Sequence, residues 1–279
     1  MALSVVDLYA KILPKTNCKD CGFPTCIAFA GMVVSEKLPL KNCPHIAPEL
    51  LASAQAELNE QYKEGKWLKK DMAAEALGVA KERAKSIDLK EMAQRTGGLF
   101  QDGKTPGPLK GQPHINLPYF NSNLLVSQEK ISDAQGNDLT RNEQTFVYIH
   151  LASGGTSSPN GNMKSLKEFP NTVSKISSMR DHVEAPIKKA FKNRLPSLEQ
   201  ACIANGGTNV SDRYESPDLA FQFRVFPKVF IVLLFWDEND GFEPDAKLMF
   251  DETVMDHMDI EAVMFMSEHL AQLLTKSEQ

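Results

Sequence analysis

Four cysteines near the start of the chain constrain it more than any other feature. They follow the spacing C-x2-C-x4-C-x16-C, at Cys18, Cys21, Cys26 and Cys43. The first residues, MALSVVDLYAKILPK, lack the basic segment of a secretory signal peptide, so we expect a cytoplasmic chain whose thiols stay reduced. Four reduced thiols so close in sequence indicate a metal site and not a set of disulfides.

The spacing favours an iron–sulfur cluster over zinc. Structural zinc sites usually contain two short cysteine knuckles, whereas here one C-x2-C pair is followed by Cys26 and, 16 residues later, by Cys43. Gly22 and Pro24 let the backbone turn closely around an inorganic core. The apolar helix expected from Cys26 offers its N–H groups and positive end to an anion. We therefore predict a [4Fe–4S] cluster with all four cysteines as ligands; structural zinc and unrelated reduced cysteines are the alternatives.

Polar residues around the cysteines give further expectations. His45 lies two residues past Cys43, where a hydrogen bond from it would tune the cluster. Four lysines flank the cysteines and would guide an acidic electron donor: Lys15, Lys19, Lys37 and Lys41. Taken singly, each lysine is more simply explained as an ordinary solvated side chain.

Changes in amino-acid composition divide the chain into three stretches. Residues 1–60 form the four-cysteine module, 61–109 a helical connector ending in a loop rich in glycine and proline, and 110–279 a mixed domain. The expected fold class is α+β, with a small helical iron–sulfur module followed by a mixed α+β domain.

Periodicity and turn residues predict the main elements. Helices are expected over 45–61, 71–94 with a break capped by Asp88, 182–191, 197–205 and 256–274. Strands are expected over 123–127, 144–151, 219–225 and 229–236. The apolar residues of 229–236 do not alternate with polar ones, so this strand should be buried on both faces.

Composition argues against two classes of partner. The net charge is −5, whereas non-specific nucleic-acid binding depends on clustered cations. The longest wholly apolar run, 229–236, is far shorter than the roughly 20 residues of a membrane-spanning helix. A cytoplasmic, reducing and anaerobic setting fits a thiol-bound cluster.

Residues 5–50 resemble the N-terminal [4Fe–4S] domain of the large subunit of the corrinoid iron–sulfur protein of the acetyl-CoA pathway. The resemblance rests on the leading amphipathic helix, the segment LPKTNCKDCGFPTCIAFA and the return NCP. It implies that Cys18, Cys21, Cys26 and Cys43 are the cluster ligands and that the cluster passes an electron to a corrinoid. The segment is also similar to the cluster segment of the Rnf-type redox subunit.

The rest of the chain departs from that family. Its large subunit continues into a barrel and a corrinoid-binding domain, and 279 residues with the first 95 largely used do not hold a (β/α)8 barrel of about 250. Residues from about 110 onward instead resemble an uncharacterised domain family fused to such cluster modules in anaerobic bacteria. That likeness rests on GGTSSPNGNMKSLKEFPN, the glycine pair at 206 and the segment from FPKVFIVLLFW to the last helix. It implies no activity.

An acidic loop is the most conspicuous polar stretch of this second part. Asp237, Glu238, Asp240, Glu243 and Asp245 follow the buried strand, and Asp251 comes soon after. Carboxylates at a strand end often bind hard cations, but their offsets do not match a calcium-binding EF-hand. A solvated turn is the simpler interpretation.

The remaining candidates for ligand binding or core packing are histidines, methionines and one cysteine. His150 at a strand end and His182 on a helix are the best candidates for axial ligands of a tetrapyrrole such as a corrinoid. His257 and His269 lie twelve residues apart on the last helix, about 18 Å, so they do not share a metal. Five methionines indicate core packing, or a pocket for a flat macrocycle: Met249, Met255, Met258, Met264 and Met266. Cys202 is expected in the core.

These patterns together predict an iron–sulfur protein that transfers single electrons. Its partners would be a ferredoxin-like donor and a corrinoid protein or other redox partner as acceptor. One alternative is a non-redox interaction protein with structural zinc. Another is an enzyme acting at the acidic loop, 237–251, although the sequence contains no nucleophile–base signature and no dinucleotide fingerprint.

Overall fold

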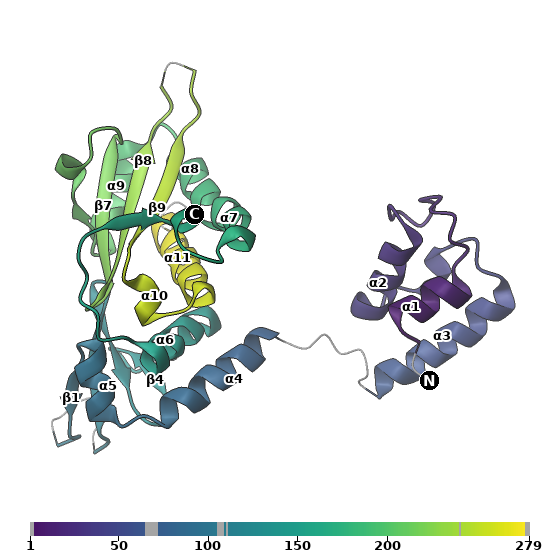
Figure 1. The fold of residues 1–279 in the computed structure, drawn as a ribbon, viewed down its shortest axis with the longest axis horizontal. Coiled ribbons are helices and arrows are strands. Elements are labelled where there is room, and N and C mark those ends of the chain that lie inside the picture. The colour runs from purple at the N-terminus through teal and green to yellow at the C-terminus, as the bar shows by residue number, and fades with distance from the viewer. Residues whose placement is uncertain (1–2, 65–71, 105–108, 110, 240, 277–279) are drawn as a thin grey trace. The chain divides into compact units, whose positions relative to one another are not determined.

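The chain folds into two compact units, Met1–Met72 and Ala73–Gln279. The structure, a computed structural model, describes residues 3–64, 72–104, 109, 111–239 and 241–276 (Figure 1). Residues 73–104, part of the predicted connector, belong to the second unit. The connector's residues 65–71 lie outside the described residues.

The first unit is helical. Its helices are α1 (Val5–Asp7), which continues as a π-helical turn over Leu8–Ile12, α2 (Cys26–Glu36) and α3 (Pro48–Lys63), with a 3-10 turn over Leu40–Asn42 before α3. Leu8, Leu40 and Leu58 come from three of these segments and are fully buried together. The helix predicted over 45–61 corresponds to α3, which begins at Pro48 because proline fits the first helical position.

The second unit begins with two helices that Asp88 separates. They are α4 (Met72–Lys85) and α5 (Leu89–Thr96). The Asp88 side chain accepts hydrogen bonds from the backbone N–H groups of Lys90 and Glu91, as an N-cap does, so the predicted break is confirmed. Asp71, in the same predicted helix, lies outside the described residues.

Two antiparallel sheets follow in the second unit. The first has the order β1 (Leu99–Gln101), β2 (His114–Tyr119), β3 (Ser122–Val126) and β4 (Ile131–Asp133). The second has the order β5 (Met163–Ser165), β9 (Asp245–Asp251), β8 (Val229–Trp236), β7 (Leu219–Phe226) and β6 (Thr208–Asn209). The predicted strands at 123–127, 219–225 and 229–236 are confirmed as β3, β7 and β8. The central position of β8 explains its unbroken apolar run.

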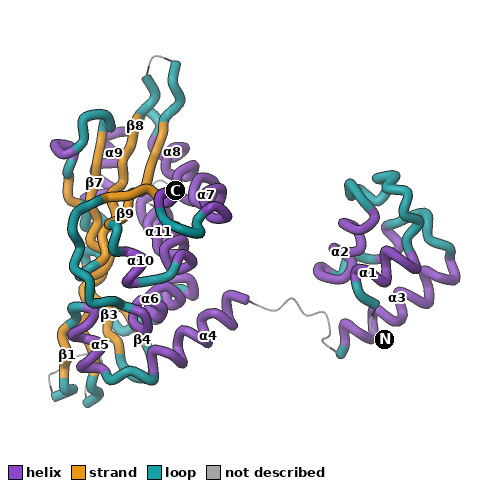
Figure 2. The backbone as a smooth tube through the Cα atoms, in the orientation of Figure 1, coloured by secondary structure: helices purple, strands orange, loops and turns teal. Residues whose placement is uncertain are grey.

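Helices cover the second sheet and share its core (Figure 2). They are α6 (Arg141–Ser153), α7 (Val173–Met179), which continues through a π-helical turn over Arg180–Glu184 into α8 (Ala185–Phe191), α9 (Leu195–Ala204), α10 (Val254–His257) and α11 (Ile260–Thr275). The core joins phenylalanines of β7, β8 and β9 to the apolar side of α11. The fold is α+β, as predicted. In the described part of the chain, no helix combines the length and apolarity that crossing a bilayer requires.

The strand predicted over 144–151 is wrong, because these residues form α6. Thr140 and Glu143 make a reciprocal capping box: the Thr140 hydroxyl accepts the Glu143 N–H, and the Glu143 carboxylate accepts the Thr140 N–H at 3.0 Å. Phe146, Val147 and Leu151 then lie on one buried face of the helix. His150 therefore lies in the last turn of a helix and not at a strand end.

The predicted last helix is two helices. Asp259 accepts the backbone N–H of Ala262 at 2.9 Å and so starts α11 at Ile260. The preceding α10 ends at His257. His257 and His269 thus lie on different helices, which corrects the placement of both on one.

Candidate metal centre

The loop that carries the first two cysteines has an unusual backbone. Lys15, Asn17 and Lys19 have φ angles of 63°, 51° and 70°, in the left-handed region, and Gly22 has 84°. Residues other than glycine rarely adopt this conformation, and each costs about 1–3 kcal/mol. Such strain gathers where a loop must present side chains or backbone to a ligand. Here it winds the C-x2-C segment tightly.

The four thiols gather at one place in the first unit, and none forms a disulfide. Cys26 and Cys43 are buried, Cys21 is half-buried and Cys18 is exposed. Burial raises the pKa of the Cys43 thiol. The charges of the other three thiols act on Cys43 in the same direction, so Cys18, Cys21 and Cys26 all lie within electrostatic range of Cys43. The set therefore runs from the core of the unit to its surface.

Two side chains fix the start of α2. Asn17 Oδ1 accepts the backbone N–H of Cys26 at 2.8 Å, and Thr25 Oγ1 accepts that of Ala28 at 3.2 Å. These two N–H groups are thus occupied and do not face an anion, which corrects the expectation that they would stabilise a cluster directly. Asn17 instead joins the C-x2-C loop to Cys26.

His45 contacts the site in two ways. Its backbone N–H donates a hydrogen bond to the sulfur of Cys43, which lowers the pKa of that thiol against the effect of burial. Its ring Nε2 lies 2.5 Å from Oδ2 of Asp20. The hydrogen bond from His45 and a second one from the Cys18 thiol lower the pKa of the Asp20 carboxyl. The predicted hydrogen bond from His45 thus comes from its backbone.

The four lysines predicted to flank the site are all exposed: Lys15, Lys19, Lys37 and Lys41. Lys37 ends α2 in a left-handed conformation, and its Nζ lies 5.6 Å from the centre of the Tyr62 ring. Lys41 lines a shallow groove of about 490 Å³ between Pro39 and α3. Only Lys15 and Lys19 belong to the cysteine loop itself, whereas Lys37 lies at the end of α2 opposite Cys26.

The acidic loop of the second unit is bound to the protein. Asp237 accepts the backbone N–H of Asn193 at 2.7 Å, and Lys192 lies 3.1 Å from Glu238 and 3.0 Å from Glu243. Asp245 pairs with Lys188 at 3.4 Å. Asp240 lies outside the described residues. These carboxylates join the β8–β9 hairpin to the end of α8, so the predicted solvated turn also makes internal contacts.

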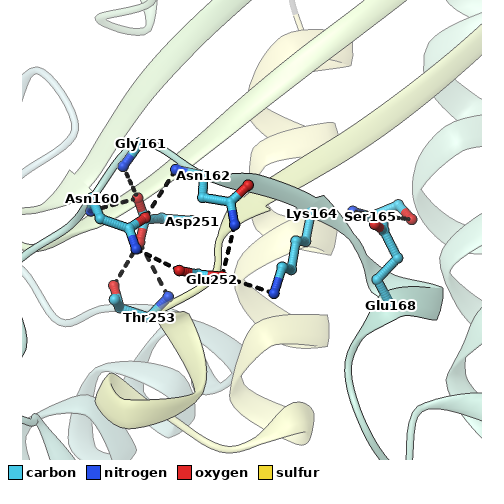
Figure 3. A network of polar contacts seen from close by, with 9 residues as sticks. All are labelled: Asn160, Gly161, Asn162, Lys164, Ser165, Glu168, Asp251, Glu252 and Thr253. Carbon is cyan, nitrogen blue, oxygen red and sulfur yellow. Dashed lines mark hydrogen bonds and ion pairs between the residues drawn. The ribbon is translucent and has the colours of Figure 1, made fainter.

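Asp251 belongs to a separate network at the other end of β9 (Figure 3). Its Oδ2 accepts the backbone N–H groups of Asn160 and Gly161, and its Oδ1 accepts the N–H and hydroxyl of Thr253. Glu252 beside it binds Lys164 at 2.7 Å and the side chains of two asparagines. The loop 154–162 is thereby held against β9, and Asp251 does not join the acidic loop in one site.

The predicted tetrapyrrole ligands lie apart in different surroundings. His150 is fully buried, with its ring 4.1 Å from that of Phe226 and its Nδ1 donating to the carbonyl of His257 at 3.3 Å. Burial lowers the pKa of His150 to about 3. His182 is an exposed histidine 3.5 Å from Glu268. No described contact brings these two candidates together.

The methionines and Cys202 pack in the protein interior. Met258, Met264 and Met266 are buried in the main core, Met255 packs against it, and Met249 lies in a small cluster on the other face of the second sheet. Cys202 is fully buried, and burial raises the pKa of its thiol far above the ordinary value. The predicted core positions are confirmed for Met258, Met264, Met266 and Cys202, whereas Met249 and Met255 are half-buried.

Sequence reasoning missed Asn17, Asp20 and Thr25. A Thr directly before an expected helix start is a recognisable N-cap signal, so Thr25 was detectable. Asn17 reaches a backbone group nine residues away and Asp20 reaches a side chain 25 residues away. Only the folded loop reveals these two contacts.

Comparison with known proteins identifies the cysteine segment. The family described as "Putative Fe-S cluster" matches residues 13–45. A subunit gamma of the acetyl-CoA decarbonylase/synthase complex from Methanocaldococcus jannaschii is 48% identical over 42 residues, 15% of this chain and 8% of that protein. The corrinoid/iron-sulfur protein large subunit of Moorella thermoacetica is 47% identical over 47 residues, 17% of this chain and 10% of that protein. The chain thus spans only a small part of these relatives.

The second unit has a different relationship. No solved structure matches the chain. A further family matches residues 88–273, from the Asp88 cap to the end of α11, and so covers more than half of the chain. The chain belongs to the family described as "Domain of unknown function (DUF3786)", with an iron–sulfur segment before it that resembles those of the corrinoid protein and of the acetyl-CoA decarbonylase/synthase gamma subunit.

Proposed function

We propose that the first unit binds a [4Fe–4S] cluster through Cys18, Cys21, Cys26 and Cys43 and transfers single electrons to a partner protein. The spacing of the sulfurs carries this proposal. The other three thiols each act on the charge of Cys43, yet among the four cysteines, all in the described part of the chain, no three have their sulfurs within 4.8 Å of one another. Around a single zinc ion, with zinc–sulfur bonds of about 2.3 Å, tetrahedral sulfurs lie about 3.8 Å apart. A four-iron cluster holds each sulfur on a different iron, which suits a wider set.

The exposure of the site suits electron transfer to another protein. The bound cluster would supply reversible uptake of one electron. Cys26 and Cys43 shield one side of the site, and the hydrogen bond from the His45 N–H to Cys43 stabilises negative charge on that sulfur. Cys18, with Lys15 and Lys19 beside it, leaves the other side at the surface. A partner that docks there comes close to the cluster.

The named relatives support a partner class. One is a corrinoid protein and the other a subunit of the acetyl-CoA decarbonylase/synthase complex. We propose that the electron acceptor is a corrinoid-type protein and that the electron donor is an acidic, ferredoxin-like protein in the cytoplasm. The lysines around the loop favour the approach of an acidic donor. The second unit, whose described acidic loop is occupied by internal contacts, would dock the partner.

Anaerobic purification of the full chain tests the proposal. We expect about four irons and four inorganic sulfides per chain, a broad absorption band near roughly 400 nm, and an EPR signal that appears on reduction with dithionite. The reduced protein should then lose this signal on mixing with an oxidised corrinoid. A Cys202→Ala variant serves as control, because this cysteine is buried in the other unit. One zinc per chain without sulfide would contradict the cluster, and an EPR signal stable to corrinoid would contradict that acceptor.

A further inference from the structure

A second set of metal-binding atoms lies beside Cys18. The Cys18 sulfur, an oxygen of Asp20 and a ring nitrogen of His45 all lie within 4.8 Å of one another. Among the described residues, this is the one group of three or more histidine, cysteine or acidic side chains with that spacing. All three side chains are exposed. The first of the four cysteines thus has neighbours able to bind a metal, and the other three belong to no such group.

Asp20 and His45 also connect the two ends of the cysteine motif. Asp20 lies between Cys18 and Cys21, and His45 follows Cys43 by two residues. Their side chains meet at 2.5 Å while remaining 52% and 47% exposed, respectively. Exposed ion pairs contribute little to stability, typically below about 1 kcal/mol. The pair therefore adds little to the stability of the unit, but it lies directly beside the Cys18 sulfur.

The chemistry of the two side chains fits iron. Imidazole replaces cysteine on an iron of Rieske clusters, so histidine is a competent ligand for an iron–sulfur centre. Metal-bound histidines usually have a carboxylate on their second ring nitrogen, which orients the ring and makes it more basic. Asp20 stands in that relation to His45.

We infer that His45, oriented by Asp20, is a reserve ligand for the iron bound by Cys18. This inference rests on the proposed cluster. In the exchange, the bond from iron to the Cys18 sulfur breaks, a bond from iron to a His45 ring nitrogen forms, and the released thiolate takes a proton from solvent. No electron is gained or lost. The iron bound by the exposed Cys18 can therefore exchange its ligand, whereas the irons bound by Cys21, Cys26 and Cys43 keep theirs.

Removal of single cysteines tests this asymmetry. The full chain is prepared anaerobically as wild type, Cys18→Ala, Cys21→Ala, and Cys18→Ala combined with His45→Gln. Cys21→Ala is the matched control, because it removes a thiol of the same loop that lies outside the group. We expect Cys18→Ala to retain about four irons and to show nitrogen coupling from imidazole in pulsed EPR of the reduced protein. Cys21→Ala and the double variant should each lose about one iron in four and show the EPR signal of an oxidised three-iron cluster.

Two results would overturn the inference. One is the same iron loss in Cys18→Ala as in Cys21→Ala; the other is a four-iron cluster in Cys18→Ala without nitrogen coupling. The single variant His45→Gln, in which Cys18 is present, should retain about four irons, and its loss of the cluster would assign His45 a structural role instead. Wild-type protein without iron and sulfide would contradict the proposed function itself. A cluster in the wild-type protein, together with equal iron loss in Cys18→Ala and Cys21→Ala, would contradict only the reserve ligand.

Discussion

The two units hold their polar side chains in opposite ways. In the first unit, a loop with strained left-handed residues carries two of four free thiols. In the second unit, the buried carboxylate of Asp251 accepts four hydrogen bonds from the protein itself. A strained loop with free thiols is typical of a ligand site, whereas a carboxylate whose hydrogen bonds are all made within the protein indicates a structural role. The cysteine segment, which matches an iron–sulfur family, is therefore the better candidate for ligand binding.

The largest effect should follow from removal of the cluster. The first unit has about 70 residues, a size at which the core alone rarely gives more than about 3–5 kcal/mol, and the left-handed residues of its loop subtract from that. Metal binding and folding are coupled in such small modules. We expect oxidative removal of iron, in the presence of a chelator, to abolish the thermal transition of the first unit and leave that of the second unchanged. Differential scanning calorimetry measures both transitions.

Chelator without oxidant is the control for this treatment, and should leave both transitions in place. A separate transition of the first unit in iron-free protein would mean that its hydrophobic core, around Leu8, Leu40 and Leu58, is sufficient alone.

A smaller effect is expected at Asp251. Asp251→Ala leaves two backbone N–H groups of the loop 154–162 and the Thr253 hydroxyl without their acceptor, so the free energy of unfolding of the second unit should fall by about 4 kcal/mol. Glu252→Ala is the matched comparison. Its neighbours are also hydrogen-bonded but partly exposed, so we expect a loss of at most about 1 kcal/mol. Urea unfolding followed by circular dichroism measures both. Equal losses would mean that burial does not distinguish the two acids.

Local signals made part of this fold predictable. The cysteine spacing, the Asp88 cap and the unbroken apolar run of β8 each lie within a short stretch of sequence, and each led to a confirmed element or family match. The segment 144–151 contains residues that favour strands, but the capping box at its start and the burial of Phe146 and Leu151 on one face decide for a helix.

Contacts between distant segments were not predictable. Asp251 binds the backbone of Asn160 and Gly161, about 90 residues away in the sequence, because β5 pairs with β9. Neither segment contains a sequence signal that predicts this pairing. Asp20 and His45 meet because the chain returns to Cys43 after α2. The spacing of the cysteines implies that return, but which side chains then touch depends on the left-handed backbone of the loop.

The smallest of the three effects concerns pH and the buried histidines. Burial lowers the pKa of His150 from 6.5 to about 3, and also lowers that of His257. The unfolded state therefore binds more protons below pH 6.5, so their contribution to stability is complete above pH 6.5 and declines as the pH falls toward 3. His150 alone should remove about 2 kcal/mol between pH 6.5 and pH 5, at about 1.4 kcal/mol per pH unit. Burial raises the pKa of Glu184, which opposes this decline.

A pair of variants separates this effect from a general sensitivity to acid. His150→Leu should reduce the slope of the second unit's unfolding free energy against pH, even if the variant is less stable at pH 7, because one of the buried titrating groups is gone while His257 and His269 remain. His182→Leu removes an exposed histidine and should leave the slope unchanged. If the unfolding free energy had the same slope against pH in both variants, the pH dependence would come from groups other than His150. Burial of this histidine would then not distinguish the two units.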